Sequence, residues 1–153
     1  MIKQHIFSLT VLLVLSSCSL KNIKMTNLEI IKSTYEGKTS EENGENLAKY
    51  AGNDISWTEA KGFPYAGTYI GLESIGKNVF SRLGSEWIDY KFTPEDYVAS
   101  DDKVVAFGTY TGTYKITNKA FTARVVHVWK LKDGKIISFE QFVDSQTVNN
   151  SMK

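Results

Sequence analysis

The pattern of apolar residues changes once along this chain, near Glu86, and this change is the strongest constraint on the fold. Before Glu86, apolar residues recur at helical spacing in three short segments. After it, the segments alternate with period 2 and are rich in Val, Tyr and Thr. Helices followed by a run of strands are typical of the α+β class. We therefore predict about three helices packed over the concave face of a strongly curved, mainly antiparallel sheet, a cone with a cavity.

Capping signals give the limits of the expected helices. Thr26, with Glu29 three residues later, forms a capping-box pattern, and Gly37 is expected to end this first helix. A second helix is expected over 40–51 and a third over 72–83, each followed by a glycine.

The strand pattern begins early, at 55–59, where apolar and polar residues alternate. A loop with Phe63-Pro64 and two glycines is expected to follow. Further strands are expected over 87–92, 104–115, 121–131 and 136–143. Asp133-Gly134 between the last two predicts a tight hairpin.

Cys18, the only cysteine, closes the string Leu15-Ser16-Ser17-Cys18 after a short apolar run that resembles a bacterial lipobox. Lys3 supplies the positive start of a secretory signal, and the apolar run is shorter than the roughly 20 residues of a membrane-spanning helix. We expect cleavage before Cys18 and lipid on its thiol. The alternatives are an unmodified cysteine in a cleaved signal, or translation beginning at Met25.

These signals predict one domain with short extensions. The expected division is a lipoprotein signal peptide at 1–17, a tether at 18–25, the folded domain at 26–147 and a C-terminal tail at 148–153. With lipid on Cys18, the domain would lie at the cell envelope, on the outer membrane or periplasmic face of a Gram-negative host.

Composition argues against several classes of function. The chain has 18 basic and 17 acidic residues and no dense basic run, so a nucleic-acid partner is not expected. Two histidines and one cysteine are too few for an ordinary zinc or haem site, so we expect no metal and no cofactor.

Short strings along the domain resemble the SnoaL-like, ketosteroid-isomerase-related branch of the nuclear transport factor 2 superfold. They are Trp57-Thr58-Glu59-Ala60, Phe63-Pro64-Tyr65-Ala66-Gly67-Thr68-Tyr69, Gly108-x-Tyr110-x-Gly112-Thr113-Tyr114-Lys115, His127-Val128-Trp129, Asp133-Gly134-Lys135-Ile136 and Gln141-Phe142-Val143-Asp144. The resemblance implies a conical α+β barrel, a homodimer through the outer sheet face, and a ligand pocket between helices and sheet. It leaves the activity open, because one superfold hosts many functions.

The strand expected over 121–131 carries His127 and Trp129 on its more apolar face, so both are predicted to point into the cavity. His127 is a candidate catalytic residue, because a neutral imidazole can act as a general base or bond a ligand carbonyl. The alternative is a core histidine whose nitrogens are satisfied by neighbouring groups. Trp129 is predicted to contact the ligand.

Trp57 and Glu59 share a face of the strand 55–59. Trp57 is predicted to line the pocket for a flat ligand, or simply to pack in the core. Glu59 is a candidate catalytic residue, because a buried carboxylate without a partner has a raised pKa and becomes a usable acid or base. The alternative is that the strand has ended there and Glu59 is solvated.

Gln141 and Asp144 close the last strand. Their spacing of three puts them on opposite faces unless a bulge intervenes. Asp144 is a candidate catalytic residue, because the resemblance implies an aspartate in the proton transfers of cyclases and isomerases. Gln141 is predicted to contact the ligand.

Three tyrosines complete the predicted ligand-binding set. Tyr110 lies on the strand 104–115, either face of which could be the inner one, and Tyr65 and Tyr69 are expected at the mouth of the cavity.

Three functions follow from these predictions. The first is acid–base catalysis on a small apolar or aromatic carbonyl compound, giving isomerisation, cyclisation or elimination. The second is binding and carriage of such a compound without catalysis. The third is a protein-interaction module of the cell envelope.

Overall fold

The computed structural model describes residues 25–153, so the predicted signal peptide, Cys18 and nearly all of the predicted tether lie outside the described residues. The elements in chain order are α1 (Asn27–Ser33), α2 (Ser40–Tyr50), β1 (Ala51–Glu59), β2 (Gly67–Ile70), α3 (Gly71–Ile75), η1 (Gly76–Phe80), α4 (Ser81–Glu86), β3 (Trp87–Ala99), β4 (Lys103–Tyr114), β5 (Lys119–Lys132), β6 (Lys135–Val143) and α5 (Ser145–Ser151). The change from helices to strands at Glu86 is confirmed.

The helix starts follow their capping residues. The predicted capping box of α1 is present, with the backbone N–H of Thr26 donating to Glu29 at 2.7 Å and the N–H of Glu29 donating to the Thr26 hydroxyl at 3.2 Å. The cap of α2 is Thr39, one residue before the predicted start. The third predicted helix is α3, η1 and α4 in direct succession, and η1 is a π-helical turn. Such turns are frequent at functional sites.

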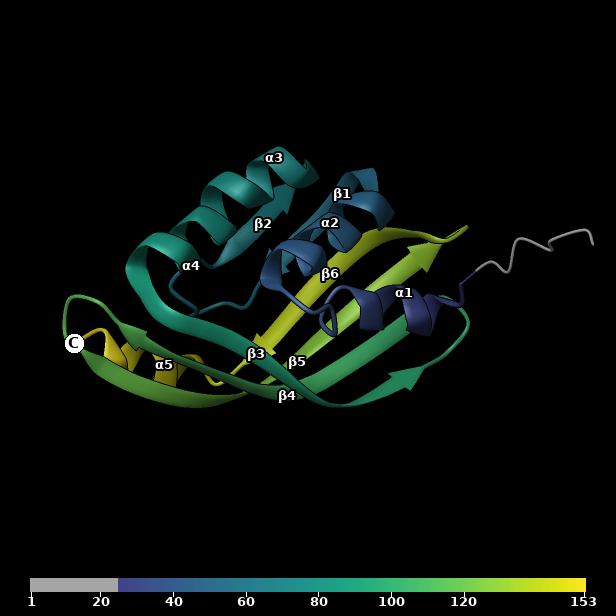
Figure 1. Ribbon diagram of the computed structural model, residues 1–153. Helices are drawn as coiled ribbons and strands as arrows, with labels where there is room; N and C mark the ends of the chain where they lie inside the picture. Colours follow the sequence, from purple (N-terminus) through teal and green to yellow (C-terminus); the bar gives the residue numbers. More distant parts are fainter. Residues whose placement is uncertain (1–24) are drawn as a thin grey trace, which may run out of the picture.

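Six strands form one open, curved sheet in the order β2-β1-β6-β5-β4-β3 (Figure 1). Neighbouring strands are antiparallel except β1 and β6, which are parallel. The α+β prediction is therefore confirmed, whereas the sheet curves without closing into a barrel. β2 begins within the loop that Phe63-Pro64 and two glycines predicted, and its four residues have no apolar alternation.

Irregular backbone lies close to where the sequence predicted it. Asp133 and Gly134 have φ of 53° and 78°, which is the hairpin turn expected between β5 and β6. The register of β3 against β4 shifts between Pro94 and Asp96, because proline cannot donate to the ladder, and β3 continues beyond this bulge to Ala99.

The chain ends in a helix where a tail was expected from residue 148. The side chain of Asp144 caps α5, and Val148 is fully buried among apolar residues beneath it. Within residues 25–153, no helix has the length and apolarity needed to cross a bilayer.

Helices α1, α2 and the α3–α4 segment lie over the same concave face of the sheet, and α5 lies at one end of it (Figure 1). The buried apolar residues form two clusters. One includes Ile31, Ile55 and Trp129, and the other includes Phe63, Trp87 and Phe121. The site described below lies where these clusters meet.

Candidate functional site

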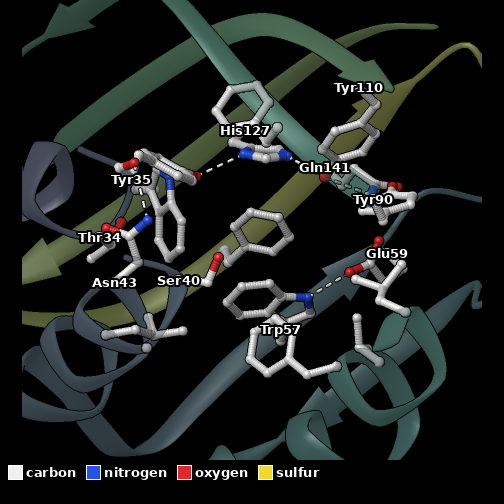
Figure 2. A pocket seen from close by; sticks show the side chains of 18 of the residues that line it. Thr34, Tyr35, Ser40, Asn43, Trp57, Glu59, Tyr90, Tyr110, His127 and Gln141 are labelled. Carbon is white, nitrogen blue, oxygen red and sulfur yellow. Dashed lines mark hydrogen bonds between the residues drawn. The ribbon is translucent and has the colours of Figure 1, made fainter. Parts of the chain in front are cut away.

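A cavity of about 420 Å³ lies between the helices and the concave face of the sheet. This volume suits a small organic molecule. Its polar lining residues are Thr34, Tyr35, Ser40, Asn43, Glu59, Tyr90, Tyr110, His127 and Gln141 (Figure 2). The rest of the lining is apolar apart from Gly44, and much of it is aromatic.

His127 on β5 has a hydrogen-bond partner on each ring nitrogen. Its Nδ1 lies 2.7 Å from the hydroxyl of Tyr35, and its Nε2 lies 2.5 Å from the hydroxyl of Tyr110. The side chain is buried, and burial lowers the pKa of the imidazole to about 3, because the cation would lose its water without gaining a negative partner. His127 is therefore neutral at neutral pH.

The hydrogen bonds continue beyond His127 in both directions and form a row of side chains. The indole N–H of Trp129 donates to the hydroxyl of Tyr35 at 2.8 Å, and the Gln141 amide donates to the hydroxyl of Tyr110 at 3.2 Å. The Gln141 carbonyl accepts the backbone N–H of Ala60 at 3.2 Å, which fixes the orientation of the amide. Side chains from the segment between α1 and α2 and from three strands thus hold one another in place.

Glu59 at the end of β1 has a less complete set of hydrogen bonds. Its Oε1 accepts the indole N–H of Trp57 at 2.7 Å, whereas Oε2 is buried and has no hydrogen-bond partner within the described chain. The residue is 4% exposed. Burial raises the pKa of Glu59 to about 7, and the bond from Trp57 offsets only part of this effect. The carboxyl group can therefore give or take a proton near neutral pH.

Tyr90 on β3 is close to the same end of the cavity as Glu59 and Tyr110 (Figure 2). Its ring centroid lies 5.1 Å from that of Tyr110, and its hydroxyl is buried with no partner within residues 25–153. Buried polar atoms are seldom left unpaired, so two such atoms beside a cavity indicate a place for a polar group of a ligand.

Six of the predicted site residues line this cavity: Trp57, Glu59, Tyr110, His127, Trp129 and Gln141. Alternation along the strands explains this outcome, because buried and less buried residues follow each other with period 2 in β4 and β5 and at the end of β1. Tyr110, whose face was left open, lies on the buried face of β4.

Asp144 lies outside the cavity, against its prediction as a catalytic residue. It is exposed, and its carboxylate accepts the backbone N–H of Thr147 at 3.1 Å and the Thr147 hydroxyl at 2.6 Å. These bonds lower the pKa of Asp144. No bulge separates Gln141 from the end of β6, so alternation directs Gln141 inward, and Asp144 caps a helix instead.

Tyr65 and Tyr69 are also absent from the cavity lining. Tyr65 is buried in the second cluster, where its hydroxyl donates to Glu86 at 2.9 Å and accepts from the indole of Trp87 at 2.6 Å. The hydroxyl of Tyr69 donates to the backbone carbonyl of Tyr65 at 2.8 Å. These two tyrosines hold the loop after β1 in place instead of forming the mouth of the cavity.

Two lining tyrosines were not predicted as site residues, Tyr35 and Tyr90. Tyr35 follows α1 and lies four residues after Ile31, so its spacing continues the apolar face of that helix and is typical of a core residue. Tyr90 follows Asp89, whose φ of 51° interrupts the alternation of β3. Period-2 counting therefore could not assign its face.

Within residues 25–153, no group of three or more histidine, cysteine, aspartate or glutamate side chains is arranged to hold a metal ion. In the cavity, Glu59 can exchange a proton near neutral pH, and His127 and the tyrosines provide hydrogen bonds.

Comparisons with known proteins agree with this geometry. The SnoaL-like domain model matches residues 35–139. A crystal structure of an NTF2-like protein from Burkholderia thailandensis is 40% identical, with a TM-score of 0.76, covering 81% of this chain and 95% of that one. No curated protein matches.

Two more distant structures share the fold. TerC, co-crystallised with polyporic acid, is 23% identical with a TM-score of 0.71, covering 82% of this chain and 97% of its own. A protein with a ketosteroid isomerase-like fold from Catenulispora acidiphila, in complex with trimethylamine, is 17% identical with a TM-score of 0.62, covering 76% of this chain and 86% of its own. The likenesses to solved structures show the NTF2-like fold, and the match of the domain model over most of the described chain shows that the chain belongs to the SnoaL-like family.

Proposed function

We propose that the cavity binds a small, largely apolar compound with a carbonyl or related oxygen, and that Glu59 exchanges a proton with it. The observation that carries this proposal is the buried Oε2 of Glu59, which faces a ligand-sized cavity without a partner. A buried carboxyl group in this state is costly to a protein unless something else uses it. A pKa of about 7 is also suited to general acid–base catalysis at neutral pH.

The apolar lining favours a flat, aromatic ligand. Trp57 stacks on Phe139 with ring centroids 3.7 Å apart, and Trp129 meets Phe139 edge-on at 4.7 Å. Phe92 packs against the imidazole of His127 at 4.4 Å. Rings arranged in this way offer flat faces and edges to another ring.

The reaction that fits these groups is proton abstraction next to a carbonyl. The Glu59 carboxylate would take the proton from carbon, and the electron pair of the C–H bond would move to give an enolate. A tyrosine hydroxyl such as that of Tyr110 would stabilise the enolate oxygen. Return of the proton at another carbon gives isomerisation, and attack of the enolate carbon on a second carbonyl gives cyclisation.

The comparison structures support a ligand-binding cavity. TerC was crystallised with polyporic acid, and the Catenulispora protein with trimethylamine. The ligand of the present chain is nevertheless inferred from its own cavity, since both likenesses are to the fold.

Tryptophan fluorescence tests binding directly. Trp57 and Trp129 line the cavity and Trp87 does not, so an aromatic ketone or quinone that enters should quench most of the signal. We suggest acetophenone, 1-indanone and polyporic acid as probes. No quenching by any of them, and no rise in melting temperature at saturating probe, would count against the proposed function.

A matched pair of glycine variants tests where the probe binds. Gly44 on α2 lines the cavity and Gly84 on α4 does not, and a Cβ built at either position meets no atom within 4 Å. Gly44→Phe should fill the α2 side of the cavity and weaken binding at least tenfold, whereas Gly84→Phe should leave it unchanged. Equal binding by both variants would place the probe elsewhere.

Hydrogen–deuterium exchange of the bound ketone distinguishes a catalyst from a carrier protein. In D₂O, a bound ketone whose α-protons are removed by Glu59 should exchange them for deuterium, at a rate that increases until pH reaches about 7. Glu59→Gln should slow this exchange roughly 10²- to 10⁴-fold while binding persists. Binding without any exchange in the native protein would favour a carrier.

We also propose that lipid on Cys18 anchors the domain at the cell envelope, on the basis of the Leu15-Ser16-Ser17-Cys18 string alone. Expressed in a bacterium, the native chain should incorporate an alkyne-tagged fatty acid and sediment with membranes. Cys18→Ser should do neither, and continued sedimentation of this variant would argue against a lipid anchor.

A homodimer through the outer face of the sheet is proposed from two apolar rows across β3–β6. The rows are Val98, Val105 and Val128, and Phe107, Val126 and Phe142. Phe142 is 51% exposed. Phe142→Asp should lower the mass found by sedimentation to that of a monomer, and Ile116→Asp, outside these rows, should not. A monomeric native protein would contradict the proposal.

A further inference from the structure

Five side chains form one continuous hydrogen-bonded row along the cavity. The row runs from Trp129 to Tyr35 at 2.8 Å, from Tyr35 to His127 at 2.7 Å, from His127 to Tyr110 at 2.5 Å and from Tyr110 to Gln141 at 3.2 Å. The two ends are N–H groups that can only donate. The direction of each bond between them depends on which nitrogen of the imidazole carries the proton.

Counting hydrogens shows that one tyrosine hydroxyl always has a proton to spare. A neutral His127 has one N–H, and Tyr35 and Tyr110 have one O–H each, which makes three hydrogens for the two bonds to the imidazole. If Nδ1 is protonated, Tyr35 keeps the spare O–H. If Nε2 is protonated, Tyr110 keeps it.

Three observations favour the spare proton on Tyr110. The Trp129 bond to Tyr35 is shorter than the Gln141 bond to Tyr110, and a hydroxyl that accepts a shorter bond is the better donor. Tyr35 should therefore donate to Nδ1. The unpartnered atoms beside the cavity, Oε2 of Glu59 and the hydroxyl of Tyr90, lie at the Tyr110 end (Figure 2).

Two polar side chains near Tyr35, those of Thr34 and Asn43, are already engaged, and Ser40 is exposed. The hydroxyl of Thr34 donates to the carbonyl of Ile31 at 2.8 Å. The Asn43 side chain accepts from the N–H of Gly37 at 2.7 Å and donates to the carbonyl of Tyr35 at 3.1 Å. A spare proton on the Tyr35 hydroxyl would meet no buried, unpartnered atom among these groups.

We propose that His127 is held as the Nε2–H tautomer, so that every bond from Trp129 through Tyr35 and His127 to Tyr110 points the same way and ends in a Tyr110 O–H directed at the ligand. Tyr35 and His127 are then positioning residues, and Tyr110 is the group that touches the ligand. Bonds aligned head to tail polarise one another, so Tyr110 is a stronger donor than an isolated tyrosine. This proposal deepens the proposed function and rests on it for the identity of the ligand-facing end.

The direction of the hydrogen bonds along the row restricts the class of ligand. The ligand must offer an oxygen that accepts from Tyr110, and next to it a C–H or O–H group that faces Glu59. A ketone, a quinone or an enolisable diketone meets both needs, whereas an amine cation or a hydrocarbon does not.

Nitrogen NMR of the histidine ring tests the tautomer without a ligand. His5→Gln in the full chain leaves His127 as the only histidine. A ¹⁵N-labelled sample should show one protonated and one unprotonated ring nitrogen between pH 5 and 8, with the coupling pattern of Nε2–H. The Nδ1–H tautomer, an even mixture of the two or a doubly protonated ring would overturn the proposal. Because no ligand is present, this result is independent of whether the proposed function holds.

The carbonyl resonance of acetophenone labelled with ¹³C at its C=O tests the donor. Binding should move it downfield through the bond from Tyr110. Tyr110→Phe should abolish this shift and Tyr35→Phe should reduce it, whereas Tyr50→Phe, which removes a tyrosine hydroxyl bonded to Met25 outside the cavity lining, should leave it intact. Trp129→Phe, which removes the N–H from the row and keeps an aromatic ring, should reduce the shift less than Tyr35→Phe. An undiminished shift in Tyr35→Phe would overturn the proposal.

Discussion

The two polar ends of the cavity differ in how fully their buried titratable group is hydrogen-bonded. At one end, both nitrogens of His127 bond to tyrosine hydroxyls. At the other, Glu59 has a partner on Oε1 and none within the described chain on Oε2. Both side chains are nearly inaccessible to solvent, so burial alone does not distinguish them. What distinguishes them is a free atom facing the cavity, which only the glutamate has.

Loss of solvation affects the two groups in opposite directions. It lowers the pKa of His127 to about 3 and raises the pKa of Glu59 to about 7, so both favour their neutral forms. The histidine contributes stability above its unfolded pKa of about 6.5 and loses it as pH falls. The glutamate contributes stability below its unfolded pKa and loses it as pH rises. The cavity is thus uncharged in mildly acidic conditions.

The largest expected effect comes from His127→Ala. Removing the ring leaves a hole in a packed region and leaves the hydroxyls of Tyr35 and Tyr110 each with one bond fewer. The free energy of unfolding at pH 7 should fall by about 3 kcal/mol, measured by urea denaturation.

A fall below about 1 kcal/mol would mean that the histidine is not held as its hydrogen bonds indicate. Ile116→Ala in the turn after β4 is a suitable control, because that side chain is 83% exposed and bonds to nothing in the row.

Glu59→Gln should stabilise the protein by an amount that grows as pH rises from about 4.5 to about 7. Glutamine keeps an oxygen for the Trp57 N–H and carries no charge. At pH 8 the native carboxylate is ionised in an apolar site, so the variant should be more stable by about 2 to 3 kcal/mol. At pH 4.5, where the native carboxyl is protonated, the difference should almost vanish.

Chemical denaturation at the two pH values measures this difference. Glu140→Gln, at an exposed carboxylate on β6, is the matched control and should show little change at either pH. A Glu59→Gln effect of the same size at pH 4.5 and pH 8 would contradict the raised pKa.

The smallest effect is expected at the third predicted catalytic residue, Asp144. Asp144→Ala removes the cap of α5 and should cost about 1 kcal/mol, while probe binding in the cavity stays unchanged. Asp144→Asn keeps a good capping side chain and should cost less. A tenfold loss of probe binding in the alanine variant would show that Asp144 contributes to the binding site.

The sequence predicted the parts of the site that lie on regular strands. Alternation directs the side chains of Glu59, His127 and Gln141 inward, and each lies on the buried face of its strand. Prediction failed where the chain leaves a regular element. Asp144 follows the last residue of β6, and Tyr65 lies in a loop, so neither has a face that counting can assign.

What the sequence by itself determined is the change from helices to strands and the inner faces of β1 and β5, because hydrophobic periodicity and capping are local properties. Only the tertiary structure decided which inner residues meet. Tyr35 and His127 are 92 positions apart, and the curvature of the sheet under α1 brings them together (Figure 1). Whether a buried group is satisfied depends on such distant neighbours, and this is why the chain's pattern alone could not separate a paired histidine from an unpaired glutamate.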